Sequence, residues 1–188
     1  MPTLVLLAGP NGAGKTTFID RFLRRRAGTF VFVNLDEVAR DFVIPGLDPG
    51  TGSGPARDLA AGRRVLERLD ALIAARADIV LETTLATRSL ARRLRACRAA
   101  PDRLARPDHQ EAYRIELIYL RLPDAEASIA RVRHRVERGG HGIPEATLRR
   151  RFPLSLAYLE TVYKPLVDAW EVYASGGETP ELLDWGPQ

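Results

Sequence analysis

Gly9-Pro10-Asn11-Gly12-Ala13-Gly14-Lys15-Thr16 fits the pattern G-x-x-x-x-G-K-[ST], which is typical of a phosphate-binding P-loop. Glycines at these positions let the backbone curl, so that its N–H groups point at phosphate oxygens. Lys15 would hold the β- and γ-phosphates, and the hydroxyl of Thr16 would bind Mg²⁺. The pattern is informative only where a strand precedes the loop and a helix follows it.

Both flanks of this loop have the expected periodicity. Residues 3–8, Thr-Leu-Val-Leu-Leu-Ala, form a short apolar run like that of a buried parallel strand. Residues 18–23 have apolar side chains at helical spacing, which places the phosphates at a helix N-terminus. We therefore predict an ATP-binding site with Mg²⁺ on Thr16. Its residues are Gly9, Pro10, Asn11, Gly12, Ala13, Gly14, Lys15, Thr16 and Thr17.

The overall composition is that of a soluble globular protein, because 45% of the 188 residues are hydrophobic and 28% are charged. We expect a single domain over residues 1–188, located in the cytoplasm. No apolar run approaches the roughly 20 residues of a membrane-spanning helix. The first apolar run leads directly into the P-loop and is therefore not a targeting signal. The single cysteine, Cys97, excludes an internal disulfide and favours a reducing compartment.

The basic residues are almost all arginine. The net charge is +4, and Lys15 and Lys164 are the only lysines among 28 basic residues. A lysine therefore stands at the P-loop position, where a compact ammonium rather than a planar guanidinium is required. The arginines occur in short runs without aromatic residues between them. Such runs are typical of solvated helix faces, so we expect no nucleic acid partner.

An acidic pair follows the second predicted strand. This strand covers residues 29–35, and Asp36 and Glu37 come directly after it. In open α/β sheets ligands bind beyond the carboxyl ends of the strands, so a carboxylate here faces the phosphate end of the site. Its place one helix after the P-loop strand suits the substrate side of a small kinase. We predict that Asp36 contacts the substrate; the alternative is that Asp36 caps the next helix.

A second carboxylate follows the third predicted strand, which covers residues 78–81. Glu82 at this edge of the sheet would bind a hydroxyl of a sugar or ribose, or would help to hold Mg²⁺. Thr83 and Thr84 add two hydroxyl groups to the same edge. The alternative role of Thr84 is to cap the next helix.

Strands and helices alternate along the rest of the chain. The further predicted elements are helices at residues 56–77 and 90–99 and strands at residues 114–122 and 170–174. We also expect a helical turn at residues 180–183, a surface loop at residues 45–55 and a surface insertion at residues 101–110. The alternation predicts an α/β P-loop NTPase or kinase fold. In this fold a five-stranded parallel sheet has helices on both faces.

Residues 124–151 are predicted to form an arginine-rich lid. Two helical segments flank the break Gly139-Gly140-His141-Gly142-Ile143-Pro144-Glu145. The arginines of the two segments are Arg131, Arg133, Arg135, Arg138, Arg149, Arg150 and Arg151. Such a lid closes over ATP and brings guanidinium groups to the transferred phosphoryl group. The alternative is a pair of basic surface helices.

Together these motifs resemble the zeta-toxin family of P-loop kinases, in its compact single-domain members. The motifs are the P-loop, Asn34-Leu35-Asp36-Glu37, Glu82-Thr83-Thr84-Leu85, Arg131-Val132, the glycine-rich break at residues 139–145 and the triplet Arg149-Arg150-Arg151. They follow one another in family order over most of the chain. The Glu-Thr-Thr stretch and the break with its triplet are more specific than the P-loop.

This resemblance implies ATP-dependent phosphorylation of an alcohol, which for the better-known toxins is the 3′-hydroxyl of UDP-N-acetylglucosamine. By analogy Asp36 would take the proton from the sugar hydroxyl, and Glu82 and Thr83 would contact the acceptor. Arg138 and Arg151 would hold the γ-phosphate. The catalytic residues implied in this way are Lys15, Asp36, Arg138 and Arg151. The resemblance also leaves open an antitoxin protein as a partner.

The acceptor stays open because the chain departs from the family pattern. Residues 173–176 lack the Asp-Asn pair of compact relatives, and the insertion at residues 101–110 is unusual. An antibiotic or another small alcohol, as in chloramphenicol phosphotransferase-like relatives, is a second acceptor class. A slow ATP-hydrolysing switch is a further alternative. A polynucleotide 5′-kinase would need stacking aromatics, which make up only 7% of the residues.

Overall fold

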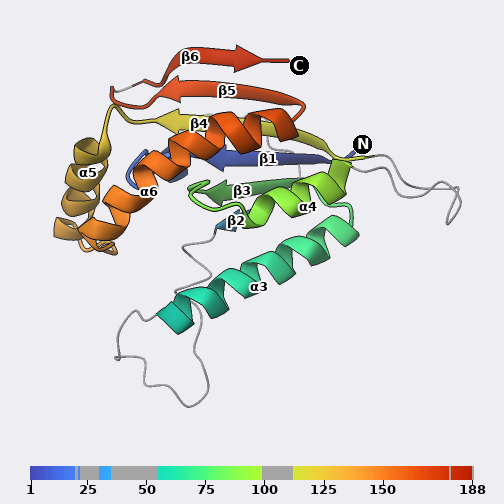
Figure 1. The fold of residues 1–188 in the computed structure, drawn as a ribbon, viewed down its shortest axis with the longest axis horizontal. Helices are drawn as coiled ribbons and strands as arrows, with labels where there is room; N and C mark the ends of the chain where they lie inside the picture. Colours follow the sequence, from blue (N-terminus) through green and yellow to red (C-terminus); the bar gives the residue numbers. More distant parts are fainter. Residues whose placement is uncertain (20, 22–29, 35–54, 99–111, 178, 188) are drawn as a thin grey trace, which may run out of the picture.

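The computed structural model describes residues 1–19, 21, 30–34, 55–98, 112–177 and 179–187. In this part of the chain six strands form one sheet in the order β2-β3-β1-β4-β5-β6 (Figure 1). The strands are β1 (Thr3–Ala8), β2 (Val31–Asn34), β3 (Ile79–Thr83), β4 (Arg114–Arg121), β5 (Ala169–Ala174) and β6 (Glu181–Gly186). The helices are α1 (Lys15–Phe18), α3 (Pro55–Ala74), α4 (Ser89–Arg98), α5 (Ala125–Glu137) and α6 (Glu145–Tyr158). A π-helical turn and a 3₁₀ turn, Leu159–Tyr163 and Lys164–Leu166, follow α6.

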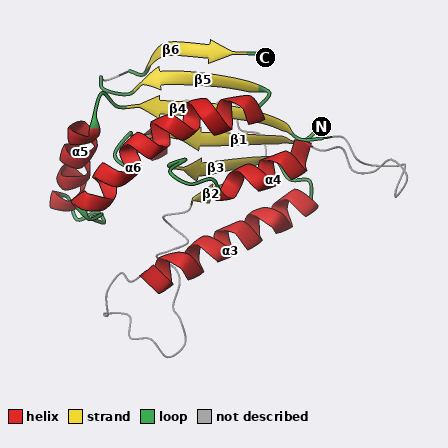
Figure 2. Cartoon of the chain, in the orientation of Figure 1, coloured by secondary structure: helices red, strands yellow, loops and turns green. Residues whose placement is uncertain are grey.

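β1 lies inside the sheet, between β3 and β4. All pairings among β1 to β5 are parallel, so their carboxyl ends gather at one edge, beside α5 (Figure 1). Side chains alternate along β1. Leu4 and Leu6 belong to a core cluster with residues of α3 and α4, whereas Val5 and Leu7 pack with Phe18 of α1 on the other face. Helices therefore cover both faces; Figure 2 shows the face beneath α3, α4 and α6.

The sheet has one strand more than the sequence predicts, and this strand is antiparallel. The helical turn expected at residues 180–183 is wrong, because residues 181–183 are the first three residues of β6, which pairs with β5 and places Trp185 opposite Glu171. This pairing satisfies the N–H and C=O groups that β5 would otherwise leave open at the edge of the sheet. Every residue from Glu181 to Trp185 is exposed. Since β6 has no buried face, its sequence lacks the apolar alternation by which strands are recognised.

The segment expected to form a lid consists of two helices, α5 and α6. Asp124 caps α5, because its carboxylate accepts a hydrogen bond from a backbone N–H of the first turn at 2.8 Å. α5 lies beyond the carboxyl ends of the parallel strands, and α6 runs back across the sheet (Figure 1). Ile129, Val132 and Leu148 form a small apolar cluster between the two helices. α6 continues to Tyr158, past the predicted boundary.

The other predicted strands, and the helices predicted at residues 56–77 and 90–99, are confirmed with small shifts at their ends. Most of the helix predicted at residues 18–23 lies outside the described residues. Glu82 and Thr83 are the last residues of β3 rather than the residues that follow it. Several predicted features lie outside the described residues, namely Asp36, Glu37 and the segments 45–54 and 101–110. Among the described helices, none has the length and apolar character needed to cross a membrane.

Candidate functional site

The loop between β1 and α1 is a tight turn that depends on glycine. Its glycines have positive φ angles, namely 142° at Gly9, 79° at Gly12 and 81° at Gly14. A Cβ atom at Gly9 would lie only 2.4 Å from the carbonyl oxygen of Leu120 in β4. The N–H of Ala13 donates to the carbonyl oxygen of Pro10 at 3.2 Å and closes the turn. The loop therefore has the compact backbone that its pattern predicts.

Lys15, the first residue of α1, is buried and bends back onto the loop. Its Nζ donates to the carbonyl oxygens of Gly9 at 3.0 Å and Pro10 at 3.1 Å. The same nitrogen lies 3.8 Å from Oε1 of Glu82, and the two side chains are only 6% and 8% exposed. A buried carboxylate therefore provides a counter-charge to the P-loop ammonium. In such surroundings the attraction between the two charges is strong.

Glu82 reaches Lys15 because β3 is the neighbour of β1, with Glu82 in register with Leu7. Its second oxygen, Oε2, accepts a hydrogen bond from Nδ2 of Asn34 at 3.1 Å. Asn34 is the last residue of β2 and is buried. Asn34 is not among the predicted site residues, although a polar residue at the end of an apolar strand indicates a position near the ligand site. Two adjacent strands and the start of α1 thus bring three polar side chains together.

The predicted hydroxyl ligands differ in their surroundings. Thr16 and Thr17 are exposed in the first turn of α1, whereas Thr83 is buried. Oγ1 of Thr83 accepts a hydrogen bond from the N–H of Leu85 at 3.1 Å and supports the positive φ of 54° at Leu85. An exposed hydroxyl at Thr16 fits a Mg²⁺ ion that also keeps phosphate and water ligands. In the described ranges, no three His, Cys, Asp or Glu side chains form a cluster for a metal ion.

Two residues of α5 contact the P-loop, of which Ser128 was not predicted and Arg131 was named only as one of the lid arginines. Oγ of Ser128 donates to the carbonyl oxygen of Asn11 at 2.6 Å, and Ser128 is 1% exposed. Arg131 donates from Nη1 to the carbonyl oxygen of Gly12 at 3.3 Å, and from Nη2 to that of Gly176 at 3.1 Å. Ser128 and Arg131 are three positions apart and therefore share one face of the helix. The spacing alone does not reveal the contact, because Asn11 of the P-loop lies 117 positions earlier in the sequence than Ser128.

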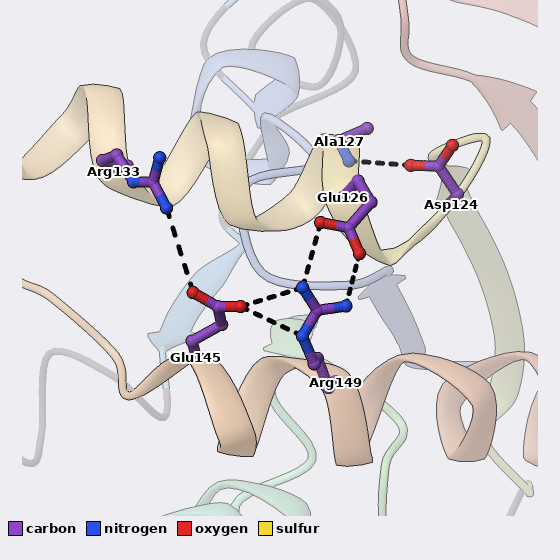
Figure 3. A network of polar contacts seen from close by, with 6 residues as sticks. All are labelled: Asp124, Glu126, Ala127, Arg133, Glu145 and Arg149. Atoms are coloured by element: carbon purple, nitrogen blue, oxygen red, sulfur yellow. Dashed lines mark hydrogen bonds and ion pairs between the residues drawn. The ribbon is translucent and has the colours of Figure 1, made fainter.

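The arginines of α5 and α6 are not equivalent. Arg149 lies between Glu126 and Glu145 and bonds to both carboxylates (Figure 3), with Nη2 at 3.1 Å from Oε2 of Glu126 and 2.8 Å from Oε1 of Glu145. Hydrogen bonds to Glu126 and Glu145 raise the pKa of the Arg149 guanidinium. Arg138 is exposed and Arg151 is half-buried, and the structure shows no bond from either guanidinium to another described residue. Arg149 therefore links the two helices, which Arg138 and Arg151 do not do within the described residues.

A protein-family model, AAA_33, which is described as an AAA domain, matches residues 4–151. The chain belongs to this AAA-domain family. Membership accounts for the α/β P-loop fold and implies that the domain binds a nucleotide. The match runs from β1 to the middle of α6 and includes the P-loop, Glu82 and the arginines of α5 and α6.

Solved structures share this fold at low sequence identity. A chain of the AvrRxo1-ORF1:-ORF2 complex with ATP is 16% identical, with a TM-score of 0.66, and the match covers 100% of this AAA domain and 59% of that chain. A chain of the PezAT chromosomal toxin-antitoxin system of Streptococcus pneumoniae is 16% identical, with a TM-score of 0.60 and coverage of 98% and 72%. A chain of the Pnkp1/Rnl/Hen1 RNA repair complex is 22% identical, with a TM-score of 0.59 and coverage of 85% and 45%.

These similarities concern the fold. The AAA domain spans 45% of the matched RNA-repair chain and 59% of the matched AvrRxo1 chain, so both proteins have substantial parts without a counterpart here. No curated protein sequence matches the chain.

Proposed function

We propose that this AAA domain is an ATP-dependent phosphotransferase that transfers the γ-phosphoryl group to a hydroxyl of a small molecule. The observation that carries the proposal is the contact of Lys15 with Glu82, which is itself held by Asn34 at the carboxyl ends of the strands. A P-loop alone supports binding, hydrolysis or transfer. The polar strand ends beside Lys15 supply what transfer additionally needs, namely groups that bind and orient an acceptor.

On the phosphate side, the backbone of residues 9–14 and the ammonium of Lys15 would bind the polyphosphate. Lys15 must then exchange part of its contact with the carbonyl oxygens of Gly9 and Pro10 for phosphate oxygens. The loop fits this ligand because its glycines leave room inside the turn. Mg²⁺, held with the help of Thr16, would neutralise charge on the phosphates when bound.

On the acceptor side, we assign Glu82 and Thr83 to the binding of the alcohol. Asp36, which lies outside the described residues, is proposed as the base. The alcohol oxygen forms a bond to the γ-phosphorus as the bond from that phosphorus to the β,γ-bridging oxygen breaks, and ADP leaves. The proton of the alcohol passes to the carboxylate of Asp36. Positioning of the two reactants supplies most of the acceleration in such a reaction.

Arg138 and Arg151 are proposed to bind the oxygens of the transferred phosphoryl group. Neither guanidinium is engaged by another described residue, whereas Arg149 is held by two carboxylates. A guanidinium that neutralises the transition-state charge contributes roughly 10³ to 10⁵ in rate. We assign the binding of the phosphoryl oxygens to Arg138 and Arg151 because, unlike Arg149, they form no ion pair with a described carboxylate.

The zeta-toxin resemblance makes UDP-N-acetylglucosamine the first acceptor to test. The similarity in fold to the PezAT toxin-antitoxin system supports this choice, and an antitoxin partner belongs to the same proposal. Antibiotics and other small alcohols form the second acceptor class. The similarity in fold to a chain of the Pnkp1/Rnl/Hen1 RNA repair complex adds RNA as a third acceptor for the same assay.

The test is a product assay with purified protein, ATP and Mg²⁺, using phosphorus NMR to detect a new phosphomonoester. We expect a product with one acceptor class and loss of that product in the Asp36→Asn variant. The matched control is the Asp184→Asn variant. Asp184 is an exposed residue of β6 that pairs with Lys164, and this variant should keep wild-type activity. ATP hydrolysis without a phosphorylated product from any acceptor would refute transfer and favour a nucleotide-hydrolysing switch.

A further inference from the structure

Besides the contacts among Lys15, Glu82 and Asn34, a second set of contacts holds the P-loop, and these contacts come from α5. Oγ of Ser128 donates to the carbonyl oxygen of Asn11, and Nη1 of Arg131 donates to that of Gly12. These two carbonyl groups belong to consecutive peptide units of the loop. A serine that is 1% exposed and bonded at 2.6 Å has lost the freedom to turn to solvent. Its hydroxyl therefore holds the loop in one orientation.

The orientation of the first peptide unit follows from its planarity. The bond between Asn11 and Gly12 is trans, so the carbonyl of Asn11 and the N–H of Gly12 point in opposite directions. Because the carbonyl faces Ser128, the N–H of Gly12 faces away from α5. α5 occupies one side of the loop, and a phosphate must approach from the other side. Ser128 thus turns a backbone donor toward the side on which phosphate binds.

The close approach of α5 is built into the sequence at Gly12. A Cβ atom there would lie 3.0 Å from Cβ of Arg131 and 3.1 Å from the carbonyl oxygen of Ser128. A larger residue would push α5 and the loop apart and lengthen both hydrogen bonds. The glycine at this position therefore serves the packing of α5 as well as the positive φ of the turn.

We propose that Ser128, supported by Arg131, is a positioning residue of the P-loop, and that α5 is a fixed wall of the nucleotide site. The inference rests on the proposed binding of nucleotide polyphosphate by the loop. Ser128 does not touch the nucleotide; it fixes the peptide unit whose N–H group does. Lid movement is then confined to the part of the predicted lid that follows α5, with the turn after Glu137 as its pivot. Gly139 has a φ of 81° in that turn.

The proposal is tested by binding rather than by turnover. ADP and inorganic tripolyphosphate are titrated calorimetrically into wild type and the Ser128→Ala variant. We expect Ser128→Ala to weaken both ligands by a similar factor of about fivefold to tenfold, which is the loss of one buried hydrogen bond. Amides of residues 11–13 in the ligand-free variant should also exchange hydrogen faster. The matched control is Tyr113→Phe, which removes a buried hydroxyl that donates to the carbonyl oxygen of Ala77 at 3.0 Å, outside the loop.

A second pair of variants keeps the proposal falsifiable if Ser128→Ala does not fold. Arg131→Ala should weaken both ligands, whereas Arg133→Ala, at an exposed residue of the same helix, should not. Binding by Ser128→Ala or Arg131→Ala within twofold of wild type, with unchanged amide exchange, overturns the proposal and leaves phosphoryl transfer intact. Conversely, normal ADP binding without any phosphorylated product refutes transfer and leaves the role of Ser128 intact.

Discussion

Nζ of Lys15 lies 3.8 Å from Oε1 of Glu82, and both side chains are buried. The pair joins the P-loop to the end of the neighbouring strand, β3. A buried ion pair contributes little net stability compared with an apolar pair, but removal of one partner leaves an uncompensated charge. Glu82 therefore contributes negative charge beside Lys15 in the ligand-free site, and the negative phosphates of a nucleotide would add to this contribution.

The first prediction concerns the Glu82→Gln variant. Loss of the carboxylate removes one buried counter-charge of the Lys15 ammonium, so the free energy of unfolding of ligand-free protein should fall by about 3 kcal/mol. Saturating ADP should then raise the melting temperature of Glu82→Gln by more than it raises that of wild type, because phosphate replaces the missing charge. Differential scanning fluorimetry with and without ADP measures both effects.

Glu116→Gln is the matched control for this experiment. Glu116 pairs with Arg114 at 2.8 Å in a partly exposed setting, where an ion pair contributes about 0–1 kcal/mol. Its response to ADP should equal that of wild type. An equal or smaller ADP response in Glu82→Gln than in wild type would show that Glu82 does not balance Lys15.

The second prediction separates the arginines of the two lid helices. Arg149 is engaged by Glu126 and Glu145, whereas Arg151 forms no ion pair with a described carboxylate. Once a phosphorylated product is identified, Arg151→Ala should lower kcat by a factor on the order of 10³. Arg149→Ala should change kcat only severalfold, because exposed ion pairs contribute little. Steady-state kinetics of the two variants measures both values of kcat. A larger loss of kcat in Arg149→Ala than in Arg151→Ala would exchange the roles of the two arginines.

Much of this fold is readable from the sequence because local patterns coincide with tertiary structure. The P-loop glycines, the apolar run of β1 and the polar ends of β2 and β3 all depend on short-range rules. Glu82 is found from its position alone, since the carboxyl end of a parallel strand is where ligands bind. Its partners Asn34 and Lys15 follow only once the strand order is known, because that order places both the end of β2 and the loop after β1 beside β3.

The elements that sequence reasoning misses are those whose signal is not local. Ser128 looks like any small residue on the buried face of an amphipathic helix, and its role appears only when α5 is placed against Asn11. β6 has no buried face, so its exposed residues, including Trp185, carry no periodic pattern. In both cases the deciding interaction is a hydrogen bond to a distant backbone group, which composition and spacing do not encode.

The third prediction concerns Gly9, where packing and conformation act together. A Cβ atom there would lie 2.4 Å from the carbonyl oxygen of Leu120, and the φ angle of 142° is in a region that favours glycine. Gly9→Ala should therefore lower the free energy of unfolding by roughly 3–5 kcal/mol. Urea denaturation followed by circular dichroism measures this loss. In the control Gly177→Ala, the new Cβ would lie 3.8 Å from the carbonyl oxygen of Thr179, so stability should stay within about 0.5 kcal/mol of wild type.

The fourth prediction is a loss of stability at alkaline pH. Burial raises the pKa of Tyr119 and that of Tyr163 to about 12 in the folded protein, whereas an unfolded tyrosine has a pKa of about 10. From about pH 10 to 12 the unfolded chain therefore loses protons that the folded chain keeps. Since the unfolded state binds fewer protons, the free energy of unfolding falls as the pH rises. One pKa unit corresponds to about 1.4 kcal/mol, so each tyrosine contributes at most about 3 kcal/mol to this fall.

Urea denaturation at a series of pH values between 8 and 12 measures this slope. Tyr119→Phe and Tyr163→Phe should each remove part of the slope above pH 10, and the double variant should remove both parts. Tyr119→Phe also loses the hydrogen bond to Oγ of Ser155 at 2.8 Å, which lowers stability at every pH and leaves the slope readable. If the double variant keeps the full alkaline slope, the loss of stability arises from other groups and the burial of these two phenols does not control it.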